Sequence, residues 1–151
     1  MKYISYLDLP EVPKNLLEDA YTIINKPNKK GSSVNQDYPY FKTKPVEAEL
    51  HSWLQDIFSF KIYPQYQLVY NGLPIHIDKG NRIIAYNYIL DAGGDNVRTV
   101  IYDHRYIPLQ IEKISANRWH SIATSMLHGV HGINSVRIAI SIGRELSSFI
   151  L

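Results

Sequence analysis

The feature that most constrains the fold is a series of eight short apolar or alternating runs that begins after Phe60. Turn residues such as Asn71-Gly72 and Gly93-Gly94 separate these runs. Short strands at regular spacing, bounded by turns, are typical of an antiparallel β-sandwich or barrel. The sequence therefore predicts a jelly roll, also called a double-stranded β-helix, whose two sheets enclose a cavity for a small ligand. The eight predicted strands span residues 66–70, 73–78, 82–90, 97–103, 107–114, 118–124, 128–133 and 137–142.

The N-terminal part has a different pattern. Apolar residues recur there at helical spacing in two segments, 13–26 and 45–58, and a proline begins each segment. Polar residues occupy the other faces, so both segments are predicted as amphipathic α-helices. We therefore expect one mainly β domain over residues 1–151, in which 1–60 form a helical N-terminal support. Residues 61–151 would form the jelly-roll core, packed by the two helices.

Composition excludes several classes of site. The chain of 151 residues has no cysteine, so a metal ion would have to be held by His, Asp or Glu. The formal net charge of +2 comes from scattered Lys and Arg and gives no strong nucleic-acid signal. No apolar run is long enough for a membrane span, and Asp8 and Pro10 interrupt the beginning of the chain before a signal-peptide core could form. We therefore expect a cytoplasmic protein.

The triplet His76-Ile77-Asp78 is the first candidate site. Residues i and i+2 of a strand share a face, so the predicted strand would point the His76 imidazole and the Asp78 carboxylate in the same direction. Two imidazoles and one carboxylate can hold an octahedral metal ion by one face and leave the other face open. A His-x-Asp triplet alone is a weak signal, and the site needs a third ligand.

Three histidines compete for the third position. His128 follows Asp78 by fifty residues and lies in a separate predicted strand, and His120 and His131 lie close to it in the sequence. Arg137 comes nine residues after His128 and opens a further strand. The residues alone therefore leave the third ligand open among these histidines.

The strand that begins at Arg137 has two unlike faces. Arg137, Ala139 and Ser141 share one face, and isoleucines occupy the other. A guanidinium group can form a bidentate pair with a carboxylate, and a serine hydroxyl can donate a further hydrogen bond. Asn87, which alternates with apolar residues on the predicted strand 82–90, could donate to the same ligand. This face therefore predicts a binding site for an acidic small molecule.

These segments resemble the Fe(II)- and 2-oxoglutarate-dependent dioxygenases, in particular the compact prolyl-hydroxylase-like members and related virus-encoded proteins. The resemblance covers about residues 66 to 143 and implies that His76, Asp78 and His128 bind Fe(II) as the catalytic centre. It also implies that Arg137 pairs with the distal carboxylate of 2-oxoglutarate. His128 is favoured because its spacing from Arg137 matches the family, whereas His120 and His131 do not. The matching segments are 70–78, 82–90, Gly93-Gly94 with Thr99, 127–130 and 137–142.

The resemblance implies an oxygenase that decarboxylates 2-oxoglutarate to succinate while it hydroxylates a small molecule or a protein side chain. Two other classes stay open. One is a cupin-like metal-binding protein that does not use 2-oxoglutarate, although such sites more often contain a denser histidine cluster with a glutamate. The other is a non-catalytic jelly roll that serves as a binding protein. Neither the substrate nor the oligomeric state can be deduced from the sequence, because substrate specificity depends on loops.

Overall fold

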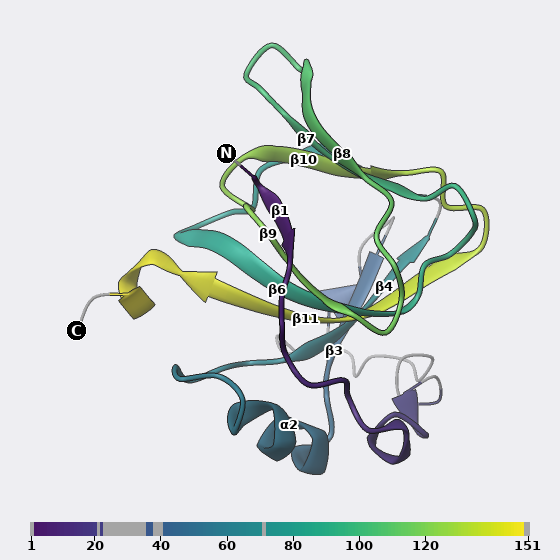
Figure 1. Cartoon of the computed structure of the whole chain (residues 1–151), viewed down its shortest axis with the longest axis vertical. Helices are drawn as coiled ribbons and strands as arrows, with labels where there is room; N and C mark the ends of the chain where they lie inside the picture. Colours follow the sequence, from purple (N-terminus) through teal and green to yellow (C-terminus); the bar gives the residue numbers. More distant parts are fainter. Residues whose placement is uncertain (1, 21, 23–35, 38–40, 71, 150–151) are drawn as a thin grey trace.

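The computed structural model describes residues 2–20, 22, 36–37, 41–70 and 72–149. Two antiparallel sheets face each other, and one α-helix lies against the outer side of the larger sheet (Figure 1). The larger sheet has the strand order β1-β9-β6-β11-β4-β3-β2 and the smaller one the order β5-β10-β7-β8. The large-sheet strands are β1 (Ile4–Tyr6), β9 (Trp119–Ile122), β6 (Arg82–Asp91), β11 (Val136–Glu145), β4 (Gln65–Tyr70), β3 (Phe41–Pro45) and β2 (Gln36–Asp37).

The smaller sheet has four strands. Its strands are β5 (Leu73–His76), β10 (Leu127–His131), β7 (Arg98–Tyr102) and β8 (Pro108–Glu112). A strand thus lies within or across each of the eight predicted segments, and the prediction of two facing antiparallel sheets is confirmed. Strand β5, however, ends at His76, two residues earlier than predicted. The backbone N–H of Asp78 donates instead to the carbonyl of Thr124, which draws the chain out of the sheet after His76.

The N-terminal sixty residues contain more strand than predicted. Strands β1, β2 and β3 all fall within the segment expected to be a helical support. β3 was missed because its pairing partner β4 lies further along the chain, and β1 and β2 were missed because they have only three and two residues. In a strand this short, side-chain alternation is too brief to be recognised.

One of the two predicted helices is clear among the described residues. Helix α2 (Ala48–Gln55) lies within the predicted segment 45–58, and Pro45 belongs to β3 instead. The other predicted helix, 13–26, begins with a 3₁₀ turn, η1 (Lys14–Leu16), while most of its second half lies outside the described residues. Packing by two helices therefore stays a prediction. A second 3₁₀ turn, η2 (Leu146–Phe149), follows β11, and no described helix is long and apolar enough to cross a membrane.

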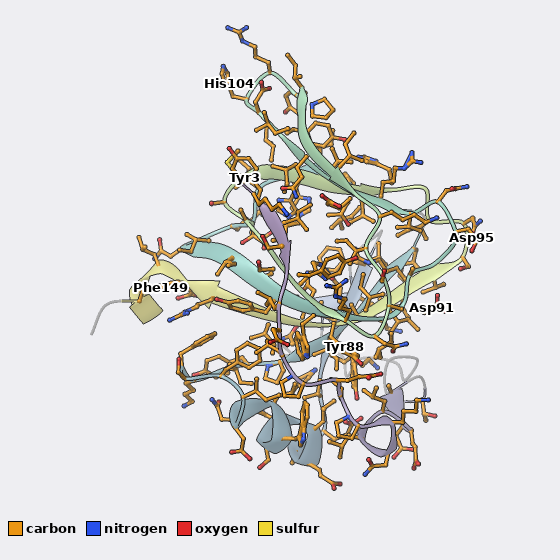
Figure 2. The ribbon with its side chains drawn as sticks, viewed as in Figure 1. Tyr3, Tyr88, Asp91, Asp95, His104 and Phe149 are labelled. Atoms are coloured by element: carbon orange, nitrogen blue, oxygen red, sulfur yellow. The ribbon has the colours of Figure 1, made fainter. Side chains whose placement is uncertain are left out.

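The larger sheet is buried on both faces. Its outer face packs against Leu50 and Leu54 of α2 and includes Tyr88, which lies on the helix side of the sheet (Figure 2). Its inner face meets the smaller sheet through apolar residues such as Ile89 and Ile101. The strand β11 divides its side chains between the two layers as predicted, since its isoleucines join the helix side and Ala139 joins the inner side. A polar residue on the inner face is therefore enclosed.

A glutamine side chain bridges the two sheets at one side of the sandwich. Strands β1 and β8 are the edges of different sheets, and Gln110 of β8 reaches across to β1. Its Oε1 accepts hydrogen bonds from the backbone N–H groups of Tyr3 and Ile4, at 2.8 and 2.9 Å. Its Nε2 donates to the carbonyl of Ile4 at 2.9 Å. The amide thus replaces part of a strand pairing that the two edges do not make.

Candidate metal and anion site

Three side chains converge at one end of the space between the sheets. Nε2 of His76 and Nε2 of His128 each lie 3.3 Å from Oδ1 of Asp78. The two histidines are direct cross-strand partners on β5 and β10, and Asp78 follows β5. Their potential ligand atoms all lie within 4.8 Å of one another. This is the spacing expected of groups that can bind one ion together.

Backbone carbonyls fix the orientation of both imidazole rings. Nδ1 of His76 lies 2.6 Å from the carbonyl of Pro74, and Nδ1 of His128 lies 2.7 Å from the carbonyl of Met126. A carbonyl only accepts hydrogen bonds, so each Nδ1 carries the proton and donates. Each Nε2 then directs its lone pair toward Asp78 when the ring is neutral. Metal-binding histidines in proteins are held by the same kind of second hydrogen bond.

The carboxylate of Asp78 provides the negative charge of this cluster. Burial alone would raise its pKa, but hydrogen bonds with His128 and His76 outweigh burial and hold the pKa of Asp78 well below its usual range. The hydrogen bond with Asp78 also raises the pKa of His76 against the opposing effect of burial. The second carboxylate oxygen, Oδ2, lies 3.6 Å from Nε of Arg82. A cation bound by the three ligands would replace the contacts that each histidine makes with Asp78.

A cavity of about 60 Å³ extends from this cluster into the sandwich. The side chains of His76 and Arg82 on its wall are 35% and 39% exposed, so this end forms the mouth. Arg137 lies on the wall too, and its side chain is buried. The other polar residues that line the cavity are Gln67, Asn87, Thr99, His120, Thr124 and Ser141.

Several residues that line the cavity have buried polar atoms without a hydrogen-bond partner. They are Nε of Arg137, Oδ1 of Asn87, Oγ1 of Thr124 and both ring nitrogens of His120. Burial lowers the pKa of Arg137 to about 10, so the guanidinium keeps its charge near neutral pH. No carboxylate of the described residues lies within ion-pair distance of it. Buried polar groups are nearly always paired, and a set of unpaired ones around one cavity indicates a place for a polar ligand.

The three histidines that compete for the third ligand position lie in different places. His128 lies with His76 and Asp78, whereas His120 lines the cavity outside this group and Nε2 of His131 contacts the hydroxyl of Tyr102 at 2.7 Å. His131 is exposed, as residues three apart on a strand point to opposite faces. His104 lies at the tip of the β7–β8 hairpin, away from the interior (Figure 2).

The residues predicted to hold a co-substrate also line the cavity. Arg137, Ser141 and Asn87 all contribute to its wall, from β11 and β6. Sequence reasoning missed Gln67 and Thr124. Gln67 alternates with the buried Tyr66 and Leu68 on β4, a pattern that could have marked it as inward-facing. Thr124 lies between two strands and had no such signal.

No protein-family model matches the chain, and no curated protein matches its sequence. Solved structures do match its fold. A Pseudomonas putida prolyl-4-hydroxylase is 10% identical with a TM-score of 0.59, over 95% of this chain and 92% of that one. A 2OG-Fe(II) oxygenase family protein from Burkholderia pseudomallei is 10% identical with a TM-score of 0.56, over 86% and 77%.

A third structure is a prolyl hydroxylase from Trichoplax adhaerens, in complex with a peptide fragment of a hypoxia inducible factor. It is 16% identical with a TM-score of 0.55, over 87% of this chain and 75% of that one. At identities this low, the structural matches establish the fold alone. The activity has to be argued from the residues of the site. The chain has the fold of the compact 2OG-Fe(II) oxygenases.

Proposed function

We propose that this protein is an Fe(II)- and 2-oxoglutarate-dependent oxygenase. Its reaction would hydroxylate a small molecule or a protein side chain and decarboxylate 2-oxoglutarate to succinate. One observation carries the proposal: a cluster of His76, Asp78 and His128 and the buried, unpaired Arg137 line the same cavity. A metal site alone would suit many proteins. A metal site that shares an enclosed cavity with an unpaired guanidinium suits a chelating ligand with a distant carboxylate.

The donor set fits iron. Two neutral imidazoles and one carboxylate, with the remaining directions open, are the ligands that non-haem Fe(II) oxygenases use. Bound iron supplies the redox chemistry that activates dioxygen. The protein supplies the rest: the carbonyls of Pro74 and Met126 orient the two imidazoles, and Arg82 holds the second oxygen of Asp78. These contacts keep Oδ1 and both Nε2 atoms directed to one point.

The inner residues fit the other end of 2-oxoglutarate. Arg137 can form a bidentate pair with the distal carboxylate, and the hydroxyl of Ser141 can donate to the same group. Asn87 can donate from its amide. The apolar packing of the two sheets excludes water around these groups, and this exclusion strengthens each charged hydrogen bond. The substrate would approach from the mouth, past His76 and Arg82.

A spectroscopic titration tests the proposal. Anaerobic protein loaded with Fe(II) should develop a visible metal-to-ligand charge-transfer band when 2-oxoglutarate is added. Exposure to dioxygen should then yield succinate slowly, even without the true substrate. A cupin-like metal protein would bind Fe(II) without the band, and a non-catalytic jelly roll would bind neither. Either of these results would reject the oxygenase proposal.

A further inference from the structure

His120 is a buried histidine that the ligand set does not use. It lies on β9, is 1% exposed, and neither ring nitrogen has a hydrogen-bond partner. Four other histidines differ from it in this respect. Each has a ring nitrogen within hydrogen-bond distance of a backbone carbonyl or a hydroxyl: His51, His76, His128 and His131. An ordinary core histidine would be paired in this way, because an unsatisfied buried polar group is unfavourable.

Strand register places His120 opposite Asn87 and in line with Ser141. His120 of β9 pairs with Asn87 of β6, and Asn87 pairs with Ser141 of β11. Directly opposed residues in neighbouring strands present their side chains to the same face, with Cβ atoms about 5 Å apart. The three residues therefore form one polar row across the inner face, and all of them line the cavity together with Arg137.

The ring of His120 is suited to donate a hydrogen bond to an anion. Burial, followed by the charge of Arg137, lowers its pKa to about 3, so the ring is neutral near pH 7. A neutral imidazole carries one N–H donor and one acceptor. Beside a guanidinium, a neutral donor adds a hydrogen bond without adding a second positive charge. A carboxylate has enough acceptor positions for both a bidentate arginine and a further donor.

We propose that His120 is a second anchor for the distal carboxylate of the co-substrate, acting together with Arg137. The proposal rests on the proposed function and assigns a residue that the metal site leaves without a role. The ring also borders a second hollow at the seam between β1 and β8, and thus separates that hollow from the cavity. A test variant should keep this wall, so leucine is preferable to alanine at position 120.

Calorimetry with two ligands and two metal states separates the possibilities. 2-Oxoglutarate and succinate are titrated into Zn(II)-loaded and metal-free protein, because zinc can support chelation without redox turnover. His120→Leu should weaken both ligands about 10- to 100-fold, the range for a lost hydrogen bond to a charged group, with zinc affinity unchanged. His120→Gln, which keeps a donor and an acceptor, should recover at least part of the loss. His131→Gln, a histidine on the exposed face, should bind like the wild type.

Stability distinguishes a ligand anchor from a structural residue. Replacement of an unpaired polar ring by leucine should leave the melting temperature of ligand-free protein unchanged or raise it. Unchanged ligand affinity in His120→Leu would overturn the proposal, as would equal losses in His120→Leu and His120→Gln. If the leucine variant does not fold, nitrogen NMR of the wild-type histidine rings decides: succinate should shift the His120 resonances and leave those of His131 in place. No shift at His120 would overturn the proposal.

The two proposals can fail separately. The wild-type protein could bind Fe(II) and 2-oxoglutarate with a charge-transfer band while His120→Leu binds 2-oxoglutarate equally well. This result would support the oxygenase function and reject the second anchor. Conversely, His120→Leu could weaken succinate binding although the wild-type protein develops no such band. This result would support the anchor and reject the oxygenase function. Failure of succinate and 2-oxoglutarate to bind wild-type protein in either metal state would overturn both.

Discussion

The polar groups at the two ends of the cavity differ in whether they have hydrogen-bond partners. At the mouth, His76, Asp78 and His128 contact one another, and backbone carbonyls bind the outer nitrogen of each ring. At the inner end, Arg137 and His120 are buried and have nitrogens without a hydrogen-bond partner. The mouth is therefore satisfied without a ligand, whereas the inner end is not. The contrast indicates that a bound anion would relieve an unfavourable state inside, while a bound metal would replace contacts that already exist.

The largest effect is expected from removal of the mouth carboxylate. Asp78→Ala deletes one of three ligand side chains and leaves two histidines without their shared partner. Loss of an outer-shell contact alone weakens metal binding about 10- to 100-fold, so loss of a ligand should exceed about 100-fold and abolish succinate formation. Competition with a metal chelator measures the affinity. Asp95→Ala, an exposed aspartate before β7, is the control, and an equal loss there would contradict the assignment.

A change at the inner end of the cavity should weaken 2-oxoglutarate binding and leave Fe(II) binding nearly unchanged. Arg137→Lys keeps the positive charge but loses the planar fork, so 2-oxoglutarate should bind about 10- to 100-fold more weakly. Fe(II) affinity should stay within about threefold, because Arg137 is not among the three metal-binding side chains. Calorimetry of both ligands gives the comparison. Arg98→Lys on the exposed side of β7 serves as control. Equal weakening of iron and 2-oxoglutarate would remove the distinction between the two ends.

The unpaired ring of His120 should make the stability of the protein depend on pH. The pKa of His120 in the fold, about 3, lies below the ordinary value of 6.5, so the unfolded chain binds this proton more readily. The fold therefore keeps its full stability above pH 6.5 and loses stability as the pH falls toward 3. Each pH unit in this window removes up to about 1.4 kcal/mol. His120→Leu should therefore lose about 2 kcal/mol less than the wild type between pH 7 and pH 5, measured by urea unfolding of metal-free protein.

The raised pKa of His76 also contributes to the pH dependence, but it is common to both proteins, so the difference between them isolates His120. Parallel pH profiles for the two proteins would show that His120 is protonated as easily in the fold as in the unfolded chain. The inner end would then be less enclosed than its burial indicates.

The smallest effect on Fe(II) affinity is expected from changes near Oδ2 of Asp78. A methyl group on Gly143 would meet the guanidinium of Arg82, whose Nε lies 3.6 Å from Oδ2 of Asp78. Arg82 is half-exposed and its ion pair is weak, so Gly143→Ala should lower Fe(II) affinity by less than about fivefold. Arg82→Gln should do the same, and the double variant should show no further loss, because both changes remove one contact. Additive losses would mean that Gly143 acts on the site by another route.

Local patterns in the sequence were enough to predict the eight strands after Phe60 and the two faces of β11. The alternation of Arg137, Ala139 and Ser141 with isoleucines is a property of one strand, and both layers of the structure follow it. The meeting of His76 with Asp78 was expected from a shared strand. It arises instead from a bend after His76, held by the hydrogen bond from Asp78 to the carbonyl of Thr124. No local pattern encodes that contact.

The place of His120 could not be predicted from the sequence because it depends on which strands pair. His120 and His128 lie on consecutive strands, but β9 pairs with β6 and β1 in the larger sheet whereas β10 pairs with β5 in the smaller one. Sheet membership is a non-local property, and a shift of register by one residue would reverse the face of every side chain. The same limit explains why β1 and β3 were not predicted as strands.

The amide of Gln110 has a consequence for the behaviour of the protein at high concentration. Edge strands with free N–H and C=O groups can recruit strands from other molecules and so promote aggregation. On this side, one side chain occupies two backbone donors and one acceptor of β1 and ties them to β8. The edge is therefore protected by a residue that takes no part in any binding site.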